Sequence, residues 1–567
     1  MIGRLDLLVA STSRVAGVSA HHPFTITDVR VFDGSGVLGA THARVLDGRI
    51  HAVGDASIQG ADDVLVDGRG GTLMPGLIDA HVHLLPGCTQ LAAVFGVTTL
   101  IDQFSKPEVI EPERAAVGAS ARGSGPVRAD LRTSGVGATA PGGHPTMAYA
   151  PLPYVTGPAD AASFVEARLD EGASHLKVVL DDGSGALLDI PTLDAATVEA
   201  LVRRAHEHRL PVVAHASTAA GAVTVARCGV DVLAHAPFDR MSDEQVAEVA
   251  GAGCALIATL SVVDGFPGPD GVLPLLAEPG LVERLPARWR KVLDAQSRRW
   301  MPPQPPDGAA ARRNTLALFR AGTPVLAGTD TPNPGLVFGA SLHRELRHLV
   351  AAGLGPTEAL AAATAVPAEV FGLSDRGRVA PGLRADLVLV DGDPTARIEA
   401  TQNLRGAWVA GCRVDPGAYP GSRTEREGIA ALRATNEKIM SAMRERWPGL
   451  PAPEQVERED GEILGRVVPT AAGWQATTVF GAPLGAVTSR EEAVETLHAT
   501  GLSSLAEPWW ARPVGRPGWQ RAHLMEVRPD RVRLRWADPL AEQPASGQWF
   551  DIDDLDLSYD RPRACRK

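Results

Sequence analysis

The sequence is poor in cysteine, in long apolar runs and in clusters of basic residues. Its 567 residues include only five cysteines, without CxxC spacing: Cys88, Cys228, Cys254, Cys412 and Cys565. An odd, scattered set argues against a disulfide framework and against a thiolate metal site, and it suits free thiols in a reducing compartment. We therefore expect a cytoplasmic protein.

Other classes of protein are excluded by what is missing. No apolar run approaches the roughly 20 residues that a membrane span needs, and the net charge of −12 comes without a long basic run. Neither a membrane nor a nucleic acid is therefore an expected partner, whereas self-association is compatible with the sequence. Asp6 and several Ser and Thr interrupt the apolar residues of the N-terminus, so we interpret residues 1–22 as a surface or edge segment rather than a signal peptide.

The composition is that of a folded globular protein, with 44% apolar and 22% charged residues. Residues 74–375 alternate short apolar strands with amphipathic helices. Eight strands are predicted: LIDAHVHL, TTLIDQF, VRADLRTSG, HLKVVLDD, PVVAHAS, DVLAHAP, CALIATL and PVLAGTD. This alternation predicts an α/β fold, a (β/α)₈ TIM barrel, because the Gly-rich phosphate fingerprint of an open doubly wound sheet is missing.

Strand-rich segments flank the middle of the chain. Residues 23–73 and 376–420 both show β-branched alternation closed by Gly or Asp-Gly turns, which predicts one small β-sandwich domain built from both flanks. Residues 265–308, rich in Pro and Arg, interrupt the barrel pattern after the seventh strand, and we expect a lid or flank there. Residues 424–567 hold a charged helix, a linker and strand patterns, among them QWFDIDDLDL, around a second helix, SREEAVETLHATG. Seven of the ten tryptophans lie from Trp447 onward, and the whole predicts a small α+β appendage of unknown role.

The first predicted strand of the barrel ends in His81-Val82-His83. Alternation along a strand places both imidazoles on one face, with Cα atoms about 6–7 Å apart. They can then reach one ion at the carboxyl end of the strand, where barrel enzymes do their chemistry. A single HxH motif is weak evidence, because a histidine is more often a hydrogen-bonded core residue.

Further polar residues close later strands. His215 ends the fifth predicted strand, His235 the sixth and Asp330 the eighth. A polar group at the end of a buried apolar run needs a partner to offset its desolvation, and a shared metal ion supplies one. We therefore predict a metal centre at this mouth of the barrel.

Lys177 lies in the apolar fourth strand, where a buried lysine is rare. It can reach water or pair with Asp181 or Asp182. Alternatively, carbon dioxide carboxylates it, giving an anion that bridges two ions.

These residues and motifs resemble the amidohydrolase superfamily, in its binuclear branch with a carboxylated lysine. Within it, the sequence is most similar to the imidazolonepropionase-like and Xaa-Pro-dipeptidase-like group, in which a GGH motif follows the third strand, here Gly142, Gly143 and His144. The other matching features are PGLIDAHVHL at 75–84, GVTT at 96–99, Lys177, His215, His235, GTD at 328–330 and PGLRADLVLVDGDP at 381–394.

The sequence departs from this group at two places. Only a dozen residues separate His83 from GVTT, so one wall of the pocket must differ. In addition, Pro145 stands where a glycine usually follows GGH. Residues 424–567 lie outside the resemblance.

The resemblance implies two divalent ions and a small-molecule substrate. His81, His83 and Asp330 would hold the more buried ion, His215 and His235 the more exposed one, and carboxylated Lys177 would bridge them. A hydroxide shared by the ions would attack a carbonyl, Asp330 would carry its proton to the leaving nitrogen, and His144 would donate to a substrate oxygen. Zinc is the first expectation, with manganese, iron or cobalt also fitting imidazole and carboxylate ligands.

The predicted activity is hydrolysis of a C–N bond in an amide, lactam, cyclic imide or dipeptide. A deaminase of the same superfamily is the second candidate, although Ala216-Ser217-Thr218 follow His215 where deaminases carry a glutamate. A lactonase or phosphotriesterase, and a non-catalytic scaffold, also remain open. We expect His206, His208, His343 and His348 to be ordinary helix residues, whereas Tyr149 and Tyr154 can line the pocket.

Overall fold

The computed structural model describes residues 22–184, 189–268, 271–299, 306–446, 449–528, 530–538, 543–544 and 546–562. Almost all of the predicted N-terminal segment 1–22, and also Trp447 and Cys565, lie outside the described residues. The four described cysteines are free thiols, as predicted. Within the described ranges, no helix is both long enough and apolar enough to cross a membrane.

The middle of the chain is an α/β structure with parallel sheets, as predicted. A three-stranded and a five-stranded parallel sheet hold, in chain order, β6 (Leu77–Val82), β7 (Val97–Asp102) and β8 (Asp130–Thr133), and then β9 (Leu176–Val179), β10 (Val212–His215), β11 (Val232–Ala234), β12 (Ala255–Ile257) and β13 (Val325–Leu326). Each strand overlaps a segment predicted as a strand. Isolated parallel bridges join the two sheets at both ends, Ala138 to Val178 and Val82 to Thr331.

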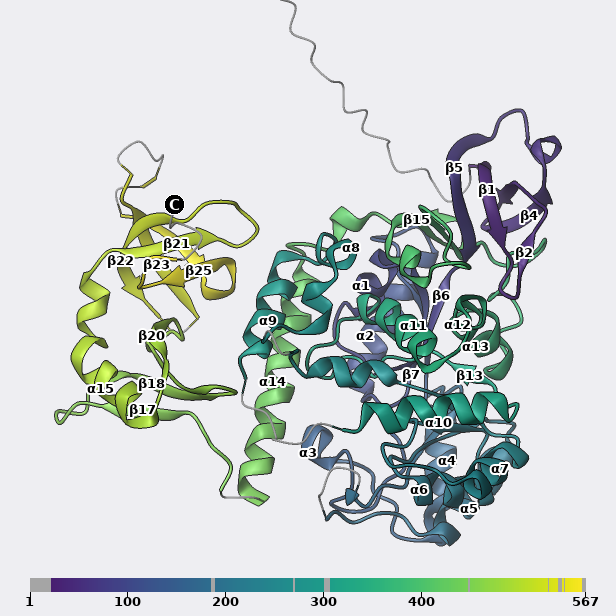
Figure 1. The fold of residues 1–567 in the computed structure, drawn as a ribbon, viewed down its shortest axis with the longest axis horizontal. Helices are drawn as coiled ribbons and strands as arrows, with labels where there is room; N and C mark the ends of the chain where they lie inside the picture. Colours follow the sequence, from purple (N-terminus) through teal and green to yellow (C-terminus); the bar gives the residue numbers. More distant parts are fainter. Residues whose placement is uncertain are drawn as a thin grey trace, which may run out of the picture.

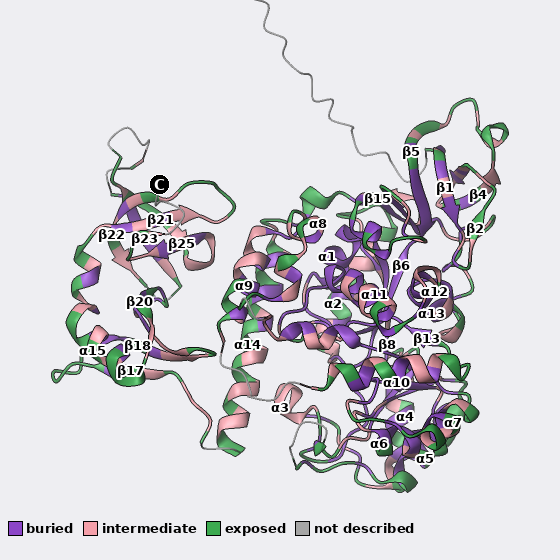
Figure 2. Cartoon of the chain, viewed as in Figure 1, coloured by how far each residue is buried: buried purple, intermediate pink, exposed green. Residues whose placement is uncertain are grey.

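Helices cover these sheets, with exposed residues on their outer faces and buried residues toward the centre (Figure 2). They are α1 (Cys88–Val94), α2 (Pro107–Ala121), α3 (Thr146–Tyr149), α4 (Ala161–Asp170), α5 (Ala195–Glu207), α6 (Ala219–Arg227), α7 (Asp243–Gly251), α10 (Gly308–Arg320), α11 (Ala340–Ala352), α12 (Pro356–Ala362) and α13 (Ala365–Val370). Local sequence determines where several of these helices begin. Ser242, for example, begins α7 with a capping box in which its side chain accepts from Gln245 N.

The two strand-rich flanks pair in one sheet. β5 (Val64–Pro75) lies between β1 (Phe24–Phe32) and β14 (Leu387–Val390), so residues more than 300 positions apart are neighbours. The remaining strands are β2 (Val37–Leu38), β3 (His42–Leu46), β4 (Arg49–Gly54), β15 (Leu404–Val409) and β16 (Cys412–Arg413). All eight strands belong to a single continuous sheet, and apolar side chains from β1, β3, β4, β5, β14 and β15 gather in one core cluster.

Residues 423–558 form a long helix and two antiparallel sheets. α14 (Arg423–Arg446) lies between the parallel-sheet part and the sheets at the C-terminal end (Figure 1). The first sheet holds β17 (Glu454–Glu457), β18 (Ile463–Thr470), β19 (Gly473–Thr477) and β20 (Pro483–Thr488), with α15 (Arg490–Thr500) against it. The second holds β21 (Trp509–Pro513), β22 (Gln520–Val527), β23 (Arg531–Trp536), β24 (Gln548–Asp551) and β25 (Leu555–Ser558). One apolar core joins both sheets, which we call the C-terminal unit (residues 454–558).

The segment after β12 is a flank that touches this unit. It contains α8 (Pro279–Val282) and α9 (Ala287–Ser297), and Trp289 is buried and donates to the Tyr419 hydroxyl at 3.2 Å. Lys291 donates to the carbonyls of Ile552 and Leu555, each at 2.7 Å. α9, within residues 265–308 that were expected as a lid or flank, thus packs into the core of the parallel-sheet part and bonds to the C-terminal unit.

Candidate metal centre

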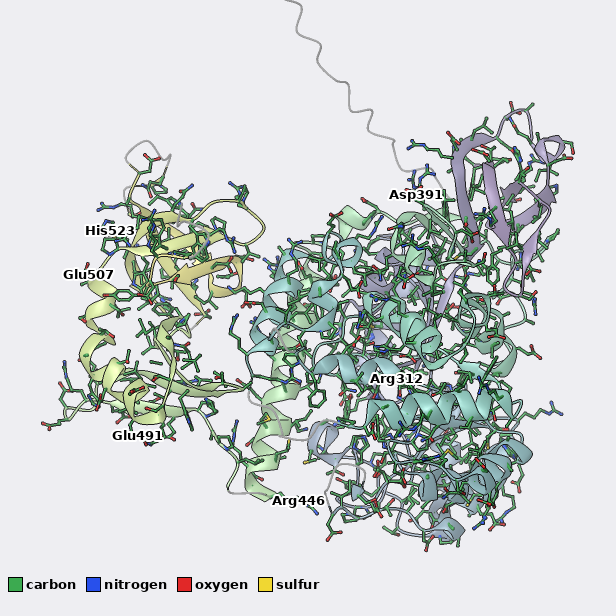
Figure 3. All side chains as sticks on the ribbon, viewed as in Figure 1. Arg312, Asp391, Arg446, Glu491, Glu507 and His523 are labelled. Atoms are coloured by element: carbon green, nitrogen blue, oxygen red, sulfur yellow. The ribbon has the colours of Figure 1, made fainter. Side chains whose placement is uncertain are left out.

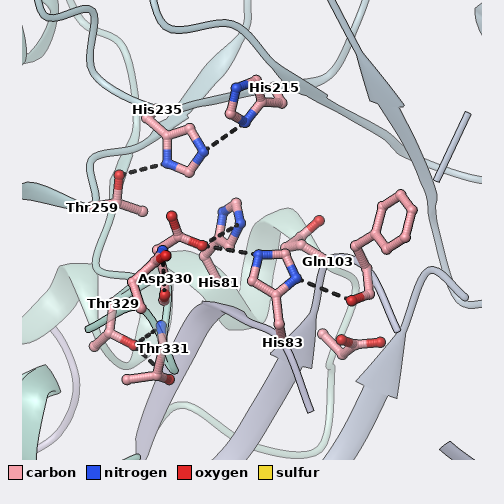
Figure 4. A network of polar contacts seen from close by, with 12 residues as sticks. His81, His83, Gln103, His215, His235, Thr259, Thr329, Asp330 and Thr331 are labelled. Carbon is pink, nitrogen blue, oxygen red and sulfur yellow. Dashed lines mark hydrogen bonds and ion pairs between the residues drawn. The ribbon is translucent and has the colours of Figure 1, made fainter. Parts of the chain in front are cut away.

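Five of the six residues predicted as metal ligands come together at the carboxyl ends of the strands: His81, His83, His215, His235 and Asp330 (Figure 4). Lys177 lies earlier in its strand, opposite Val213. His81 lies in β6, His215 ends β10, and His235 and Asp330 follow β11 and β13. One nitrogen of His81, one of His235 and one carboxylate oxygen of Asp330 lie within 4.8 Å of one another. Beneath them is an apolar layer to which Val213, two residues before His215 on the same strand face, contributes.

His83 and Asp330 meet through two atoms that both carry lone pairs. His83 Nδ1 lies 3.0 Å from the carbonyl of Phe104, which can only accept, so Nδ1 carries a proton. In neutral His83, Nε2 is then a lone pair, and it faces Asp330 Oδ1 at 2.9 Å. Two acceptors at this distance repel each other unless a proton or a metal ion lies between them.

His215 and His235 repeat this arrangement. His215 Nε2 lies 2.7 Å from the Asp181 carboxylate, and His235 Nδ1 lies 2.7 Å from the Thr259 hydroxyl. If both outer nitrogens carry protons, the inner ones, His215 Nδ1 and His235 Nε2, are lone pairs that face each other at 2.9 Å. This second contact also needs a cation or a proton.

Two buried nitrogens at the site have no hydrogen-bond partner among the described residues: His81 Nδ1 and Lys177 Nζ. Lys177 is 2% exposed, so it does not reach water. It pairs with neither Asp181 nor Asp182, since Asp181 bonds to His215. The expectation that Lys177 finds water or a carboxylate is therefore wrong, and its amine is available for a further ligand or for modification.

Burial and charge set the protonation of the site. Burial lowers the pKa of Lys177 to about 7 and holds the pKa of His81 and of His235 well below the ordinary value of histidine. Burial alone would raise the pKa of Asp330, but the hydrogen bond from His83 and the nearby imidazoles outweigh it and lower that pKa. Burial likewise opposes protonation of His83, and Asp330 reverses the effect, so the pKa of His83 is raised. Burial thus keeps His81 and His235 neutral, and Asp330 is ionised, which are the forms that bind metal ions; without an ion, the proton of the His83–Asp330 pair is on His83.

Asp79 is a functional residue that the sequence analysis missed. Its buried carboxylate accepts from His81 N at 3.2 Å, from Thr329 N at 3.0 Å and from the Thr329 hydroxyl at 2.7 Å. It therefore ties the end of β6 to the loop that carries Asp330, whose own backbone N–H donates to the His81 carbonyl at 2.8 Å. The signal was present in PGLIDAHVHL, where an aspartate interrupts an apolar strand.

The loop after β8 brings His144 and Tyr149 to the same place. The His144 ring stacks on His215 with centroids 4.7 Å apart, although its side chain is exposed. Tyr149, in α3, lies 5.1 Å from Phe104 and 6.3 Å from His83 between ring centroids. Tyr154 is partly buried in the same cluster, and Phe104, Tyr149 and Tyr154 together form an aromatic wall beside the site.

α14 supports two loops of the site. Gly428 lies so close to the loop after His83 that a Cβ atom there would be 2.5 Å from the Pro86 carbonyl oxygen. Thr424 donates to the Gln90 side chain at 3.2 Å, and Lys438 donates to the Ala150 carbonyl, directly after α3, at 2.6 Å. The loop after His83 is short, and a helix from outside the parallel-sheet part packs over it.

Three of the four histidines expected to be ordinary helix residues have structural partners away from the candidate ligands. His206 is 44% exposed and pairs with Asp231, and no partner of His208 places it near the site. His343 is buried and bonds to the Phe95 carbonyl, while His348 bonds to Asp264.

Known proteins resemble this chain in sequence. A sequence model of the amidohydrolase family matches residues 72–414. Imidazolonepropionase of Cereibacter sphaeroides (strain KD131) is 30% identical over 234 residues, 39% of this chain and 47% of that protein. Adenine deaminase 2 of Desulfotalea psychrophila is 35% identical over 113 residues, 19% of each chain. The chain thus spans less than half the length of these curated relatives.

Solved structures resemble it in fold. A Xaa-Pro dipeptidase with bound methionine superposes with a TM-score of 0.56 at 20% identity, covering 69% of this chain and 100% of that one. Ochratoxinase of A. niger gives a TM-score of 0.53 at 19% identity, covering 69% of this chain and 96% of that one. Neither match extends over the whole chain.

Proposed function

The chain belongs to the amidohydrolase family, and we propose that it is a metal-dependent hydrolase that cleaves a C–N bond of a small molecule. The observation that carries this proposal is the pair of acceptor-to-acceptor contacts, His83 with Asp330 and His215 with His235. When both facing atoms are unprotonated, each contact is repulsive, and a shared cation makes it attractive. The proposed substrates are an amide, lactam, cyclic imide or dipeptide.

We propose that β6–β13 close into a (β/α)₈ barrel whose carboxyl ends form the mouth of the site. The bridges from Ala138 to Val178 and from Val82 to Thr331 support this closure. The pairing of β5 with β14 supports a small β domain built from both flanks, residues 23–73 and 376–420. Residues 424–567 would be the appendage.

The residues fit two divalent ions. His81, His83 and Asp330 would hold one, His215 and His235 the other, and Lys177, carboxylated, would lie between them. When bound, such ions supply positive charge that makes water acidic and polarises a carbonyl. Imidazole and carboxylate donors without thiolate favour zinc, with manganese, iron or cobalt as alternatives.

The environment of Lys177 suits carboxylation. Only a neutral amine attacks carbon dioxide, forming the N–C bond of a carbamate and releasing one proton. Burial lowers the pKa of Lys177 to about 7, so a large fraction of the amine is neutral at neutral pH. The new carboxylate would lie among imidazoles and bound ions, which offset the cost of burying it.

Asp330 and His144 have the other roles. The Asp330 carboxylate is ionised, so it can accept the proton of the attacking water and donate it to the leaving nitrogen. His144 is exposed at the mouth beside His215, where it can donate to a substrate oxygen. The aromatic wall of Phe104, Tyr149 and Tyr154 keeps water from one side of the site.

Deamination is the second candidate function, because the matching relatives include adenine deaminases. Two features favour C–N hydrolysis of another kind. Ala216-Ser217-Thr218 follow His215 without a glutamate, and the amine of Lys177 is buried without a hydrogen-bond partner among the described residues, as a residue to be carboxylated would be. A lactonase or phosphotriesterase would use nearly the same groups, and a scaffold would have no reason to keep them.

Asp330→Asn tests the mechanism. Asp330 has a φ of +60°, a conformation that asparagine tolerates, so the variant should fold. We expect the hydrolysis rate to fall about 10²–10⁴-fold with the circular dichroism spectrum unchanged. The assay screens N-acyl amino acids, dipeptides and cyclic imides with enzyme loaded with metal under bicarbonate.

The control is Asp391→Asn, at a carboxylate that is 62% exposed and far from the site (Figure 3). It should keep parental activity. Parental activity in Asp330→Asn would refute the mechanism, and fewer than two ions per wild-type chain would refute the binuclear centre.

A further inference from the structure

Among the described residues, Asp181 is the one carboxylate that bonds directly to the outer nitrogen of a candidate ligand. It follows β9, and β9 pairs with β10 in parallel so that Val179 lies opposite His215. Asp181 is two residues beyond Val179, so its side chain lies on the same face, one step further along. This register brings Asp181 Oδ2 to 2.7 Å from His215 Nε2.

The carboxylate is itself held in place. Asp181 Oδ1 accepts from Gly183 N at 2.8 Å, and Asp181 N donates to the Thr192 hydroxyl at 2.8 Å. The Asp181 and His215 side chains are only 11% and 13% exposed, so water competes little for the bond between them. Asp181 therefore presents a fixed acceptor to His215.

A fixed acceptor decides which nitrogen of a neutral imidazole carries the proton. A carboxylate only accepts, so the proton is on Nε2 and the lone pair is on Nδ1. Nδ1 is the atom that faces His235 Nε2 at 2.9 Å. In the other tautomer, Nδ1 would carry a hydrogen and could not bind an ion.

We propose that Asp181 is a positioning residue that locks His215 in the tautomer able to bind an ion together with His235. The proposal rests on the proposed function, in which these two histidines share an ion. Asp181 differs from the other partners at the site in being charged, since Phe104 offers a carbonyl and Thr259 a hydroxyl. A charged acceptor binds an N–H about twice as strongly as a neutral one.

The experiment compares Asp181→Ala, Asp181→Asn and the matched control Asp182→Ala. Asp182 is the next residue in the same loop, and its carboxylate accepts only from Ser184 N among the described residues. Zinc is titrated into each metal-free protein against a chromophoric chelator. We expect Asp181→Ala to bind one of its two ions about 10–100-fold more weakly, with the other ion unchanged. Asp181→Asn keeps a neutral acceptor and should lose less, and Asp182→Ala should match the wild type.

A second readout separates this inference from the proposed function. In metal-free protein labelled with ¹⁵N-histidine, the His215 resonances, assigned by their loss in His215→Gln, report the tautomer. Wild type should show a protonated Nε2, and Asp181→Ala should show a mixture of tautomers.

Equal zinc affinities in wild type and Asp181→Ala, or an unchanged His215 tautomer, would overturn the role of Asp181. If the wild type binds no zinc, the proposed function fails, and the NMR comparison still decides whether Asp181 sets the tautomer. If Asp181→Ala does not fold, the intermediate affinity expected of Asp181→Asn provides the test, and wild-type affinity there would count against the proposal.

Discussion

The parallel-sheet part and the C-terminal unit bury different kinds of side chain. Between β6 and β13, charged groups such as Asp79, Lys177 and Asp264 lie in the interior. Among the described residues of 454–558, no charged side chain is buried, and the core is apolar, with Trp509 at its centre. Burying a charge costs desolvation free energy unless a partner compensates it. The parallel-sheet part folds despite this cost, whereas the C-terminal unit does not incur it. Part of that cost lies where the chemistry is proposed, at Asp79 and Lys177, whereas Asp264 is paired with Arg344 and His348.

The largest effect should come from breaking the apolar core of the C-terminal unit. Trp509 is fully buried and donates to the Ser504 carbonyl at 2.8 Å. We expect Trp509→Ala to destabilise this unit by about 3–5 kcal/mol. Denaturant unfolding followed by tryptophan fluorescence should show an early transition, with the zinc content unchanged.

Trp549→Ala, at a tryptophan that is 36% exposed, is the control and should change little. If Trp509→Ala loses bound zinc as well as stability, the two regions do not differ as described.

A pH series tests the buried carboxylates. Burial raises the pKa of Glu345 to about 8, although Leu260 N and Ser261 N donate to it. Between the ordinary value of 4.5 and about 8, the unfolded chain has released this proton and the folded chain retains it. Stability is therefore greatest below the ordinary value and is lost as pH rises, by up to about 1.4 kcal/mol per pH unit.

The measurement is chemical unfolding of wild type and Glu345→Gln at pH 5–9. The advantage of the wild type in free energy of unfolding over Glu345→Gln should narrow or reverse as pH rises, because the variant has no proton to lose at this position. A difference that does not vary with pH would show that Glu345 is already ionised in the folded protein.

The smallest effect concerns the contact between the regions. Arg288, 13% exposed, bonds to Asp554 at 2.6 Å and lies 3.4 Å from Glu425, which is 1% exposed. In Arg288→Ala, Glu425 stays buried but loses its cationic partner from α9. We therefore expect the free energy of unfolding to fall by about 1–3 kcal/mol. Arg433→Ala removes an exposed pair with Asp553 and should cost about 0–1 kcal/mol.

The rate of limited proteolysis after α14 is measured in both variants. Faster cleavage in Arg288→Ala than in Arg433→Ala is the expected order, and the reverse order would show that surface charge holds the contact.

Strand ends were predictable from sequence because the signal is local. An apolar run closed by His or Asp marks a strand of the parallel sheets and the side chain at its end, as at His215 and Asp330. Partners across strands were not predictable, because they depend on register. From the sequence, Asp181 was a possible ion-pair partner of Lys177. Only the pairing of Val179 with His215 shows that it bonds to His215 instead.

The C-terminal unit shows the same limit. QWFDIDDLDL was predicted as one strand pattern, but a 3₁₀ turn at Ile552–Asp554 separates β24 from β25. Lys291, more than 250 residues earlier, binds the carbonyls on both sides of that turn. Local alternation cannot report a contact of this range. By contrast, α15 follows Ser489, an N-cap visible in the sequence, and was predicted.

The close approach of Gly428 to Pro86 has a practical consequence for shortened versions of the protein. The barrel-like sequence pattern ends before residue 420, and a shortened gene would naturally stop there. Such a fragment would lack α14, so Pro86 in the loop after His83 and Gln90 in α1 would lose the helix that covers them. The shortest fragment worth expressing to test the proposed activity therefore ends after Arg446, so that it retains the whole of Arg423–Arg446.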